Sequence, residues 1–237
     1  MTKSIETDIL IIGAGPVGLF TVFEAGLLGL KCHLVDNLDK IGGQCIELYP
    51  EKPIYDIPGV PNQTGKEHID SLLKQIEPFD YEVHLNQRVD KIEESGDYWI
   101  AETTDGISFK TLNIFIAAGA GSFEPRKPPV ESPDKFLGKG IDYAVRSVDK
   151  YKDKDIVIFG GGDSALDWSV ELANKAKSIK LVHRRDNFRG AEHTENKMRN
   201  FVASGEIELK IPFVIKSIVG GKSLSLIHIS EPTRPRI

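Results

Sequence analysis

Two segments of the chain share one pattern of apolar and polar positions: a short apolar run, a glycine-rich turn, and then apolar residues at helical spacing. The apolar runs are Ile-Leu-Ile-Ile at 9–12 and Ile-Val-Ile-Phe at 156–159. A short apolar run bounded by turn residues favours a buried strand, and the helical period that follows it favours an amphipathic helix. The pattern therefore predicts two βαβ units, over 8–36 and 155–185.

The remaining sequence favours loops, shorter strands and one further helix. Residues 37–65 are rich in Gly, Pro, Asn and Asp, so we expect mostly loop, and residues 67–76 have a helical pattern. Residues 81–118 and 206–219 favour short strands. A cluster of prolines within 122–140 is the expected linker between two domains.

The first glycine-rich turn, Gly-Ala-Gly-Pro-Val-Gly, has the spacing of a dinucleotide-binding fingerprint. Its three glycines allow a tight turn, the approach of a pyrophosphate to the backbone, and close packing of helix on strand. An acid follows about 20 residues further on, where it accepts hydrogen bonds from a ribose diol. The predicted contacts at this first site are Gly13, Gly15, Pro16, Val17, Gly18 and Asp36.

The second turn, Gly-Gly-Gly-Asp-Ser-Ala, is followed at similar spacing by His-Arg-Arg instead of an acid. Guanidinium groups make charge-assisted hydrogen bonds to phosphate, so this site favours NADP(H), which carries a 2′-phosphate. The alternative is a solvated basic turn. The predicted contacts are Gly160, Gly161, Gly162, Asp163, Ser164, His183, Arg184, Arg185 and Arg189. The chain is thus predicted to bind two different dinucleotides.

The loop after the first unit adds candidates for contacts with a ring system. Gly43 follows another glycine, and such small residues let the chain lie against a flat ring. Gln44 could hydrogen-bond a flavin or a ribose, and Tyr49 could stack on a ring. Each residue also has a simpler interpretation, as part of an ordinary loop or as a core aromatic.

Composition and charge exclude some classes of protein. The chain has 237 residues, of which 40% are hydrophobic and 27% charged, as in globular proteins. No apolar run approaches the roughly 20 residues of a membrane span, and the start lacks the apolar stretch of a signal peptide, so we expect a cytoplasmic protein. Acidic groups predominate in 1–115 and basic groups in 116–237. The basic half suits a phosphorylated cofactor and an acidic protein partner, or it is simply an unevenly charged surface.

Beyond these motifs, the chain resembles the thioredoxin-reductase-like class of ferredoxin/flavodoxin–NADP⁺ reductases from about residue 5 to about 222. The likeness is carried by both glycine turns, Asp36, and the segments 42–44, 48–52, 55–56, 117–126, 160–168 and 183–189. It implies an α/β fold with two Rossmann-like domains, the FAD domain interrupted by the NADP domain. It also implies a homodimer that passes hydride from NADPH to FAD and then single electrons to ferredoxin or flavodoxin. The FAD contacts implied are Asp36, Gln44, Tyr49, Val89 and Phe123.

The cysteines argue against two related classes of enzyme. Thioredoxin reductases need Cys-x-x-Cys just before the second glycine turn, and residues 140–147 contain no cysteine. Glutathione-type disulfide reductases need a second cysteine five residues after Cys45, where Pro50 stands. The flavin must then pass electrons directly to a partner, and we assign no general acid, base, nucleophile or metal ligand. The alternatives are a flavoprotein with a quinone or other small-molecule acceptor and an inactive NADP-binding fragment.

The last residues differ in character from the rest of the chain. Residues 224–234 match the translation of a transposase adapter used in sequencing libraries, so we expect a non-native tail over 223–237 and a native protein that continues past about 222. The alternative is a native disordered tail. The expected domains are an FAD-binding part over 1–118 and an incomplete NADP-binding domain over 119–222.

Overall fold

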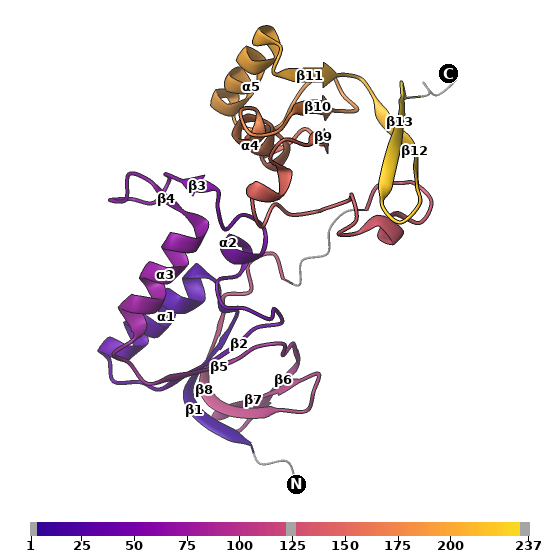
Figure 1. The fold of residues 1–237 in the computed structure, drawn as a ribbon. Helices are drawn as coiled ribbons and strands as arrows, with labels where there is room; N and C mark the ends of the chain where they lie inside the picture. Colours follow the sequence, from indigo (N-terminus) through magenta and orange to yellow (C-terminus); the bar gives the residue numbers. More distant parts are fainter. Residues whose placement is uncertain (1–3, 122–126, 233–237) are drawn as a thin grey trace. The chain divides into compact units, whose positions relative to one another are not determined.

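The structure is a computed structural model that describes residues 4–121 and 127–232. The chain forms two compact units, Met1–Glu124 (unit 1) and Pro125–Ile237 (unit 2) (Figure 1). Each unit contains one of the two glycine-rich turns. The linker expected within 122–140 includes this division.

Unit 1 is built on a sheet of six strands, four parallel and two antiparallel. In spatial order these are β5 (Tyr81–His84), β2 (Cys32–Val35), β1 (Ile5–Ile12), β8 (Ser108–Ile116), β7 (Tyr98–Thr103) and β6 (Val89–Ser95). The first four run parallel, and β8, β7 and β6 pair antiparallel. The parallel strands end together beside the first glycine turn, which is where open α/β sheets bind their ligands.

Two helices, α1 (Pro16–Leu27) and α3 (Gly65–Ile76), pack together on one face of this sheet (Figure 1). Ile9 and Ile11 of β1 belong to the core beneath the helices, whereas Leu10 belongs to a separate core on the other face. Residues 9–12 of this strand are therefore all apolar, because both faces of the sheet are covered there.

Short elements connect the strands and helices of unit 1. Helix α3 begins two residues before the predicted start, because Thr64 and Glu67 form a capping box. The segment predicted as mostly loop also contains α2 (Gln44–Glu47) and the short strands β3 (Pro53–Ile54) and β4 (Gln63–Thr64).

Unit 2 contains a three-stranded parallel sheet in the order β11-β10-β9. Its elements are β9 (Asp155–Phe159), α4 (Asp163–Leu172), β10 (Ser178–Val182), α5 (Glu192–Ser204) and β11 (Ile207–Lys210), preceded by the 3₁₀ helices η1 (Pro133–Phe136) and η2 (Asp149–Tyr151). Leu166, Leu181 and Met198 are fully buried at its centre. The prediction of an α/β fold with two Rossmann-like units is confirmed. That one domain interrupts the other stays a prediction.

A hairpin follows the sheet of unit 2. Strand β12 (Val214–Gly220) pairs antiparallel with β13 (Leu224–Ser230), and the amide of Leu224 donates to the carbonyl of Lys139 at 2.8 Å. The residues predicted to form a non-native tail thus include a paired strand, while the origin of this tail stays a prediction. Among the described helices, none combines the length and apolar character that a bilayer span requires.

Candidate dinucleotide sites

The first glycine turn brings the end of β1, the start of α1 and the residues after β8 into close backbone contact. At Gly13, with φ of 111°, an added Cβ would lie 2.3 Å from the carbonyl oxygen of Ala117, which follows β8. At Gly18 an added Cβ would lie 1.9 Å from the carbonyl oxygen of Gly13. Gly15 caps α1 and Pro16 takes the first helical position, where its missing N–H is not needed. The turn therefore leaves the N-terminus of α1 open, a place that favours anions.

A second glycine pair lies directly against this turn. The amide of Gly42 donates to the carbonyl of Ala14 at 2.9 Å. At Gly43, with φ of 56°, an added Cβ would lie 3.0 Å from the Cα of Gly15. A side chain at Gly43 would fill the space between the two loops, so this glycine leaves the space lined by backbone, whereas at Gly42, with φ of 123°, an added Cβ would lie 2.3 Å from the side chain of Ile46.

Asp36 stands at the end of β2 and ties the turn to this strand. Its Oδ2 accepts from the amide of Ala14 at 2.7 Å, and its Oδ1 accepts from the amide of Leu38 at 2.8 Å. Each carboxylate oxygen can accept a further hydrogen bond, which is what recognition of a ribose diol needs. The sequence predicted the place of Asp36 but not that it also fixes the conformation of the turn.

These residues line one cavity of about 460 Å³ in unit 1, a size typical of ligand sites. The predicted residues on its wall are Gly13, Gly15, Pro16, Val17, Asp36, Gly43, Gln44, Tyr49 and Val89. Gly18 is not on the wall and acts beneath it, and Phe123 lies outside the described residues. Sequence reasoning missed Gln87 and Arg88, which also line the cavity. The amide of Gln87 donates to the carbonyl of Asp36 at 2.9 Å, a contact that depends on tertiary structure.

Cys45 and Tyr49 lie side by side on the wall of this cavity. Burial raises the pKa of the Cys45 thiol, and burial together with the neighbouring Cys45 raises the pKa of Tyr49 to about 12. Both groups therefore stay neutral at pH 7, and a protonated, buried thiol is a poor nucleophile. Tyr49 also packs against the core beneath α1 and α3.

The second glycine turn is held by the loop that carries the arginines. An added Cβ at Gly161 would lie 2.2 Å from the ring of His183, and the carbonyl of Gly161 accepts from the amide of Arg189 at 2.7 Å. Gly162 caps α4, and Asp163 Oδ1 accepts from the amide of Ala191 at 2.8 Å. Both ends of the loop are thus anchored near the start of α4.

His183 lies beneath this loop. Its ring is buried and stacks on Phe188 with centroids 5.2 Å apart, and its Nε2 lies 3.2 Å from the carbonyl oxygen of Asn187. Burial, reinforced by the nearby arginines, lowers the pKa of His183. A neutral His183 therefore packs against the turn. That it also contacts a cofactor stays a prediction.

The charged residues of the second site have open access to solvent. Arg184, Arg185 and Arg189 are exposed, as are Asp163 and Ser164 at the start of α4. Three guanidinium groups on an anchored loop, beside a helix N-terminus, form an arrangement that favours a phosphorylated ligand.

Comparison with known proteins gives one family match over most of the chain. Residues 7–231 match the family described as pyridine nucleotide-disulphide oxidoreductase. A ferredoxin–NADP reductase of Bradyrhizobium sp. (strain BTAi1) is 55% identical over 212 residues, covering 89% of this chain and 62% of the relative. One from Pelagibacter ubique is 48% identical over 227 residues, covering 96% of this chain and 67% of the relative. The chain therefore spans somewhat less than two thirds of the first relative and about two thirds of the second.

Solved structures show the same fold. Thioredoxin reductase of Lactococcus lactis superposes with a TM-score of 0.80 at 26% identity, covering 95% of this chain and 71% of that one. Thioredoxin reductase of T. acidophilum superposes with a TM-score of 0.82 at 17% identity, covering 96% and 71%. Because the second identity is low, that likeness concerns the fold alone.

Proposed function

The chain belongs to the pyridine nucleotide-disulphide oxidoreductase family, and we propose that it acts as an FAD-dependent ferredoxin–NADP reductase. In this proposal unit 1 holds FAD and unit 2 holds NADP(H). The relatives that share about half of its residues bear the name of this activity.

The contrast between the two glycine turns carries the proposal. After the first turn, Asp36 offers carboxylate oxygens, which suit a ribose diol. After the second turn, Arg184 and Arg185 offer guanidinium groups, which suit a 2′-phosphate. One chain with both arrangements is suited to accept NADPH as electron donor and a different dinucleotide as resident cofactor.

The hydrogen-bonding groups that line the cavity in unit 1 suit FAD. The open N-terminus of α1, at Gly15 and Pro16, would receive the pyrophosphate, and Asp36 would accept from the ribose. Gln44 and Tyr49 would bound the ring end of the site, a role that follows from the resemblance and from their place on the cavity wall. When bound, FAD supplies the capacity to take up hydride and to release single electrons, and the protein supplies position and electrostatics.

A protein dithiol has no part in this proposal. The sequence contains two cysteines, Cys32 and Cys45, and both are buried. Burial raises the pKa of Cys32 to about 11 and also raises that of Cys45. Electrons would therefore pass from the flavin directly to the acceptor.

We further propose ferredoxin or flavodoxin as the acceptor, a homodimer as the working form, and the cytoplasm as its location. The excess of basic residues after residue 116 supports an acidic protein partner.

Acceptor assays test the proposal. Steady-state oxidation of NADPH would be measured with ferredoxin, flavodoxin and a soluble quinone, together with the flavin absorbance near 450 nm. We expect a yellow protein whose kcat/KM is highest with ferredoxin or flavodoxin and falls as salt concentration rises. A higher kcat/KM with quinone would favour the small-molecule alternative. A colourless protein that binds NADPH would favour the non-enzymatic alternative.

A further inference from the structure

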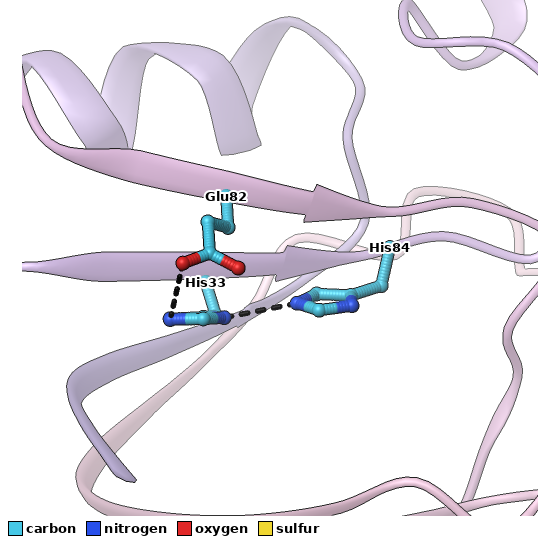
Figure 2. A group of neighbouring side chains, drawn as sticks. All are labelled: His33, Glu82 and His84. Atoms are coloured by element: carbon cyan, nitrogen blue, oxygen red, sulfur yellow. Dashed lines mark hydrogen bonds and ion pairs between the residues drawn. The ribbon is translucent and has the colours of Figure 1, made fainter. Parts of the chain in front are cut away.

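Two histidines and a glutamate gather at the edge of the sheet in unit 1, apart from the cavity. His33 lies on β2, and Glu82 and His84 lie on the edge strand β5 (Figure 2). The parallel register pairs His33 with Glu82, and Val35 with His84. Because paired residues share a face and alternate residues share a face, all three side chains project from the same side of the sheet. This is the side opposite α1 and α3, since Val35 belongs to the core on that face.

The two rings are already held close to each other. His33 Nδ1 and His84 Nε2 are 2.9 Å apart, and the rings lie edge to edge, with centroids 5.2 Å apart and an interplanar angle of 15° (Figure 2). Phe109 packs edge-on against His84 with a centroid distance of 5.0 Å. The two imidazoles are thus held next to each other before any ligand binds, so bringing both to one ion requires little rearrangement of the chain.

One nitrogen in this group lacks a hydrogen-bond partner. His33 is 2% exposed, and among the described residues nothing lies within hydrogen-bond distance of its Nε2. The nearest charged group is Glu82 Oε1, at 3.9 Å. A buried polar atom without a partner is unfavourable, so the present pairing of His33 with Glu82 is not optimal, and no hydrogen bond to this ring opposes a rearrangement of Glu82.

The set of donors is that of a transition-metal site. Two imidazole nitrogens and one carboxylate oxygen lie within 4.8 Å of one another. Imidazole and carboxylate suit zinc and its neighbours, and a tetrahedral zinc with bonds of 2.0–2.1 Å would hold its ligands about 3.3 Å apart. The two histidines are near that separation already. Glu82 has a side chain that is 55% exposed, so it can rotate to close the remaining distance.

The ion pair between Lys31 and Glu82 is too weak to prevent this rotation of Glu82. Lys31 Nζ lies 3.5 Å from Glu82 Oε1 in an ion pair whose side chains are both well exposed. Such exposed pairs contribute little to stability, so an ion could compete with Lys31 for the carboxylate. An ion of this class binds imidazole in its neutral form and carboxylate in its ionised form, and the cluster offers both groups.

We propose that His33, Glu82 and His84 bind one divalent transition-metal ion of the zinc class, with water as the fourth ligand. The ion replaces the hydrogen bond between the two rings and joins the edge strand β5 to β2. The carbonyl of His84 accepts from the amide of Asp36 at 3.0 Å. The ion therefore also stiffens the strand end that positions Asp36. The proposal concerns a structural site and does not depend on the proposed electron transfer.

Zinc binding by the untagged chain tests this directly. Protein stripped with a chelator would be dialysed against buffers of fixed free Zn²⁺, and bound zinc would be counted by mass spectrometry, with the melting temperature measured alongside. We expect one zinc per chain and a higher melting temperature in zinc. Glu82→Gln and His84→Gln should each weaken binding at least tenfold and remove the temperature shift. His68→Gln is the matched control, because His68 lies on α3 in the same unit and contacts Gln63 outside the cluster.

The outcomes divide clearly. Loss of binding in both variants, with an unchanged circular dichroism spectrum and normal binding in His68→Gln, supports the site. If His84→Gln unfolds, Glu82→Gln decides, because its exposed side chain can change without disturbing the core. Folded wild-type protein that shows no saturable zinc binding overturns the proposal and leaves a pair of histidines that share a proton. Binding that persists in both variants also overturns it, because the zinc then lies elsewhere.

Discussion

Arg184 and Arg185 provide the most direct test of how the second site selects its dinucleotide. Both side chains are exposed, and the loop that carries them is anchored by other groups, namely the ring of His183 and the amide of Arg189. Replacing both arginines with alanine should therefore remove phosphate recognition without unfolding unit 2. Lys180→Ala is the control, since Lys180 is a basic residue of the same unit whose ion pair with Glu208 lies on the sheet.

The expected magnitude follows from the lost hydrogen bonds. A hydrogen bond to a charged group contributes about 1.5–3 kcal/mol, and exposure favours the lower end of that range. Two lost contacts then cost about 3 kcal/mol, which corresponds to roughly a 100- to 200-fold loss.

The assay compares the two nicotinamide cofactors. The double variant Arg184→Ala/Arg185→Ala should lose this factor in kcat/KM for NADPH, while kcat/KM for NADH changes little, because NADH has no 2′-phosphate. The Lys180→Ala control should leave both values near wild type. An equal loss for NADPH and NADH in the double variant would refute the assignment of the second site.

Three further predictions follow from burial and close contacts. Cys32→Ser combined with Cys45→Ser should leave NADPH-to-ferredoxin electron transfer largely intact, and a folded, flavin-bound variant without activity would contradict a mechanism free of thiols. Gly18→Ala should lower the urea-unfolding free energy by about 1–3 kcal/mol, because its Cβ would meet a carbonyl oxygen at 1.9 Å. Gly162→Ala should cost less, because nothing lies within 4 Å of its Cβ and only the N-cap of α4 changes. The pKa of His183 is lowered from its ordinary value of 6.5, so the unfolded chain binds this proton more readily than the folded chain. The contribution of neutral His183 to the free energy of unfolding is therefore fully present above pH 6.5 and is lost as the pH falls below that value. His183→Gln should make the free energy of unfolding depend less on pH, as measured by urea titrations between pH 5 and 8.

The two βαβ units could be predicted because their signals are local. An apolar run, a glycine turn and a helical period lie next to one another in the sequence, and β1, α1 and β2 form where they indicate. The segment from 37 to 65 was expected to be mostly loop, and the structure adds α2, β3 and β4 there. Elements of two to four residues are too short to show a period, so their pattern cannot be recognised in the sequence.

The candidate sites divide in the same way. The glycine turns and the charged residues after them could be predicted, because each residue type meets a requirement of its own local turn. Gln87 and Arg88 could not, because they reach the cavity only when the loop between β5 and β6 comes to lie beside the residues that follow β2. Asp36 was predictable only in part. Its place at the strand end was predictable, but its hydrogen bond to Ala14 requires the folded turn.

The histidine cluster could not be predicted from a local sequence pattern alone. His33 and His84 are 51 positions apart in the sequence, and only the register of β2 with β5 brings them together. A slip of one residue would turn His33 toward the helices and separate the pair. A signal was nevertheless present, because the parallel strand Cys-His-Leu-Val is buried on both faces and places a titratable group where an apolar one is expected. A polar residue at such a position needs a partner, so the search for that partner across the neighbouring strand leads to Glu82 and His84.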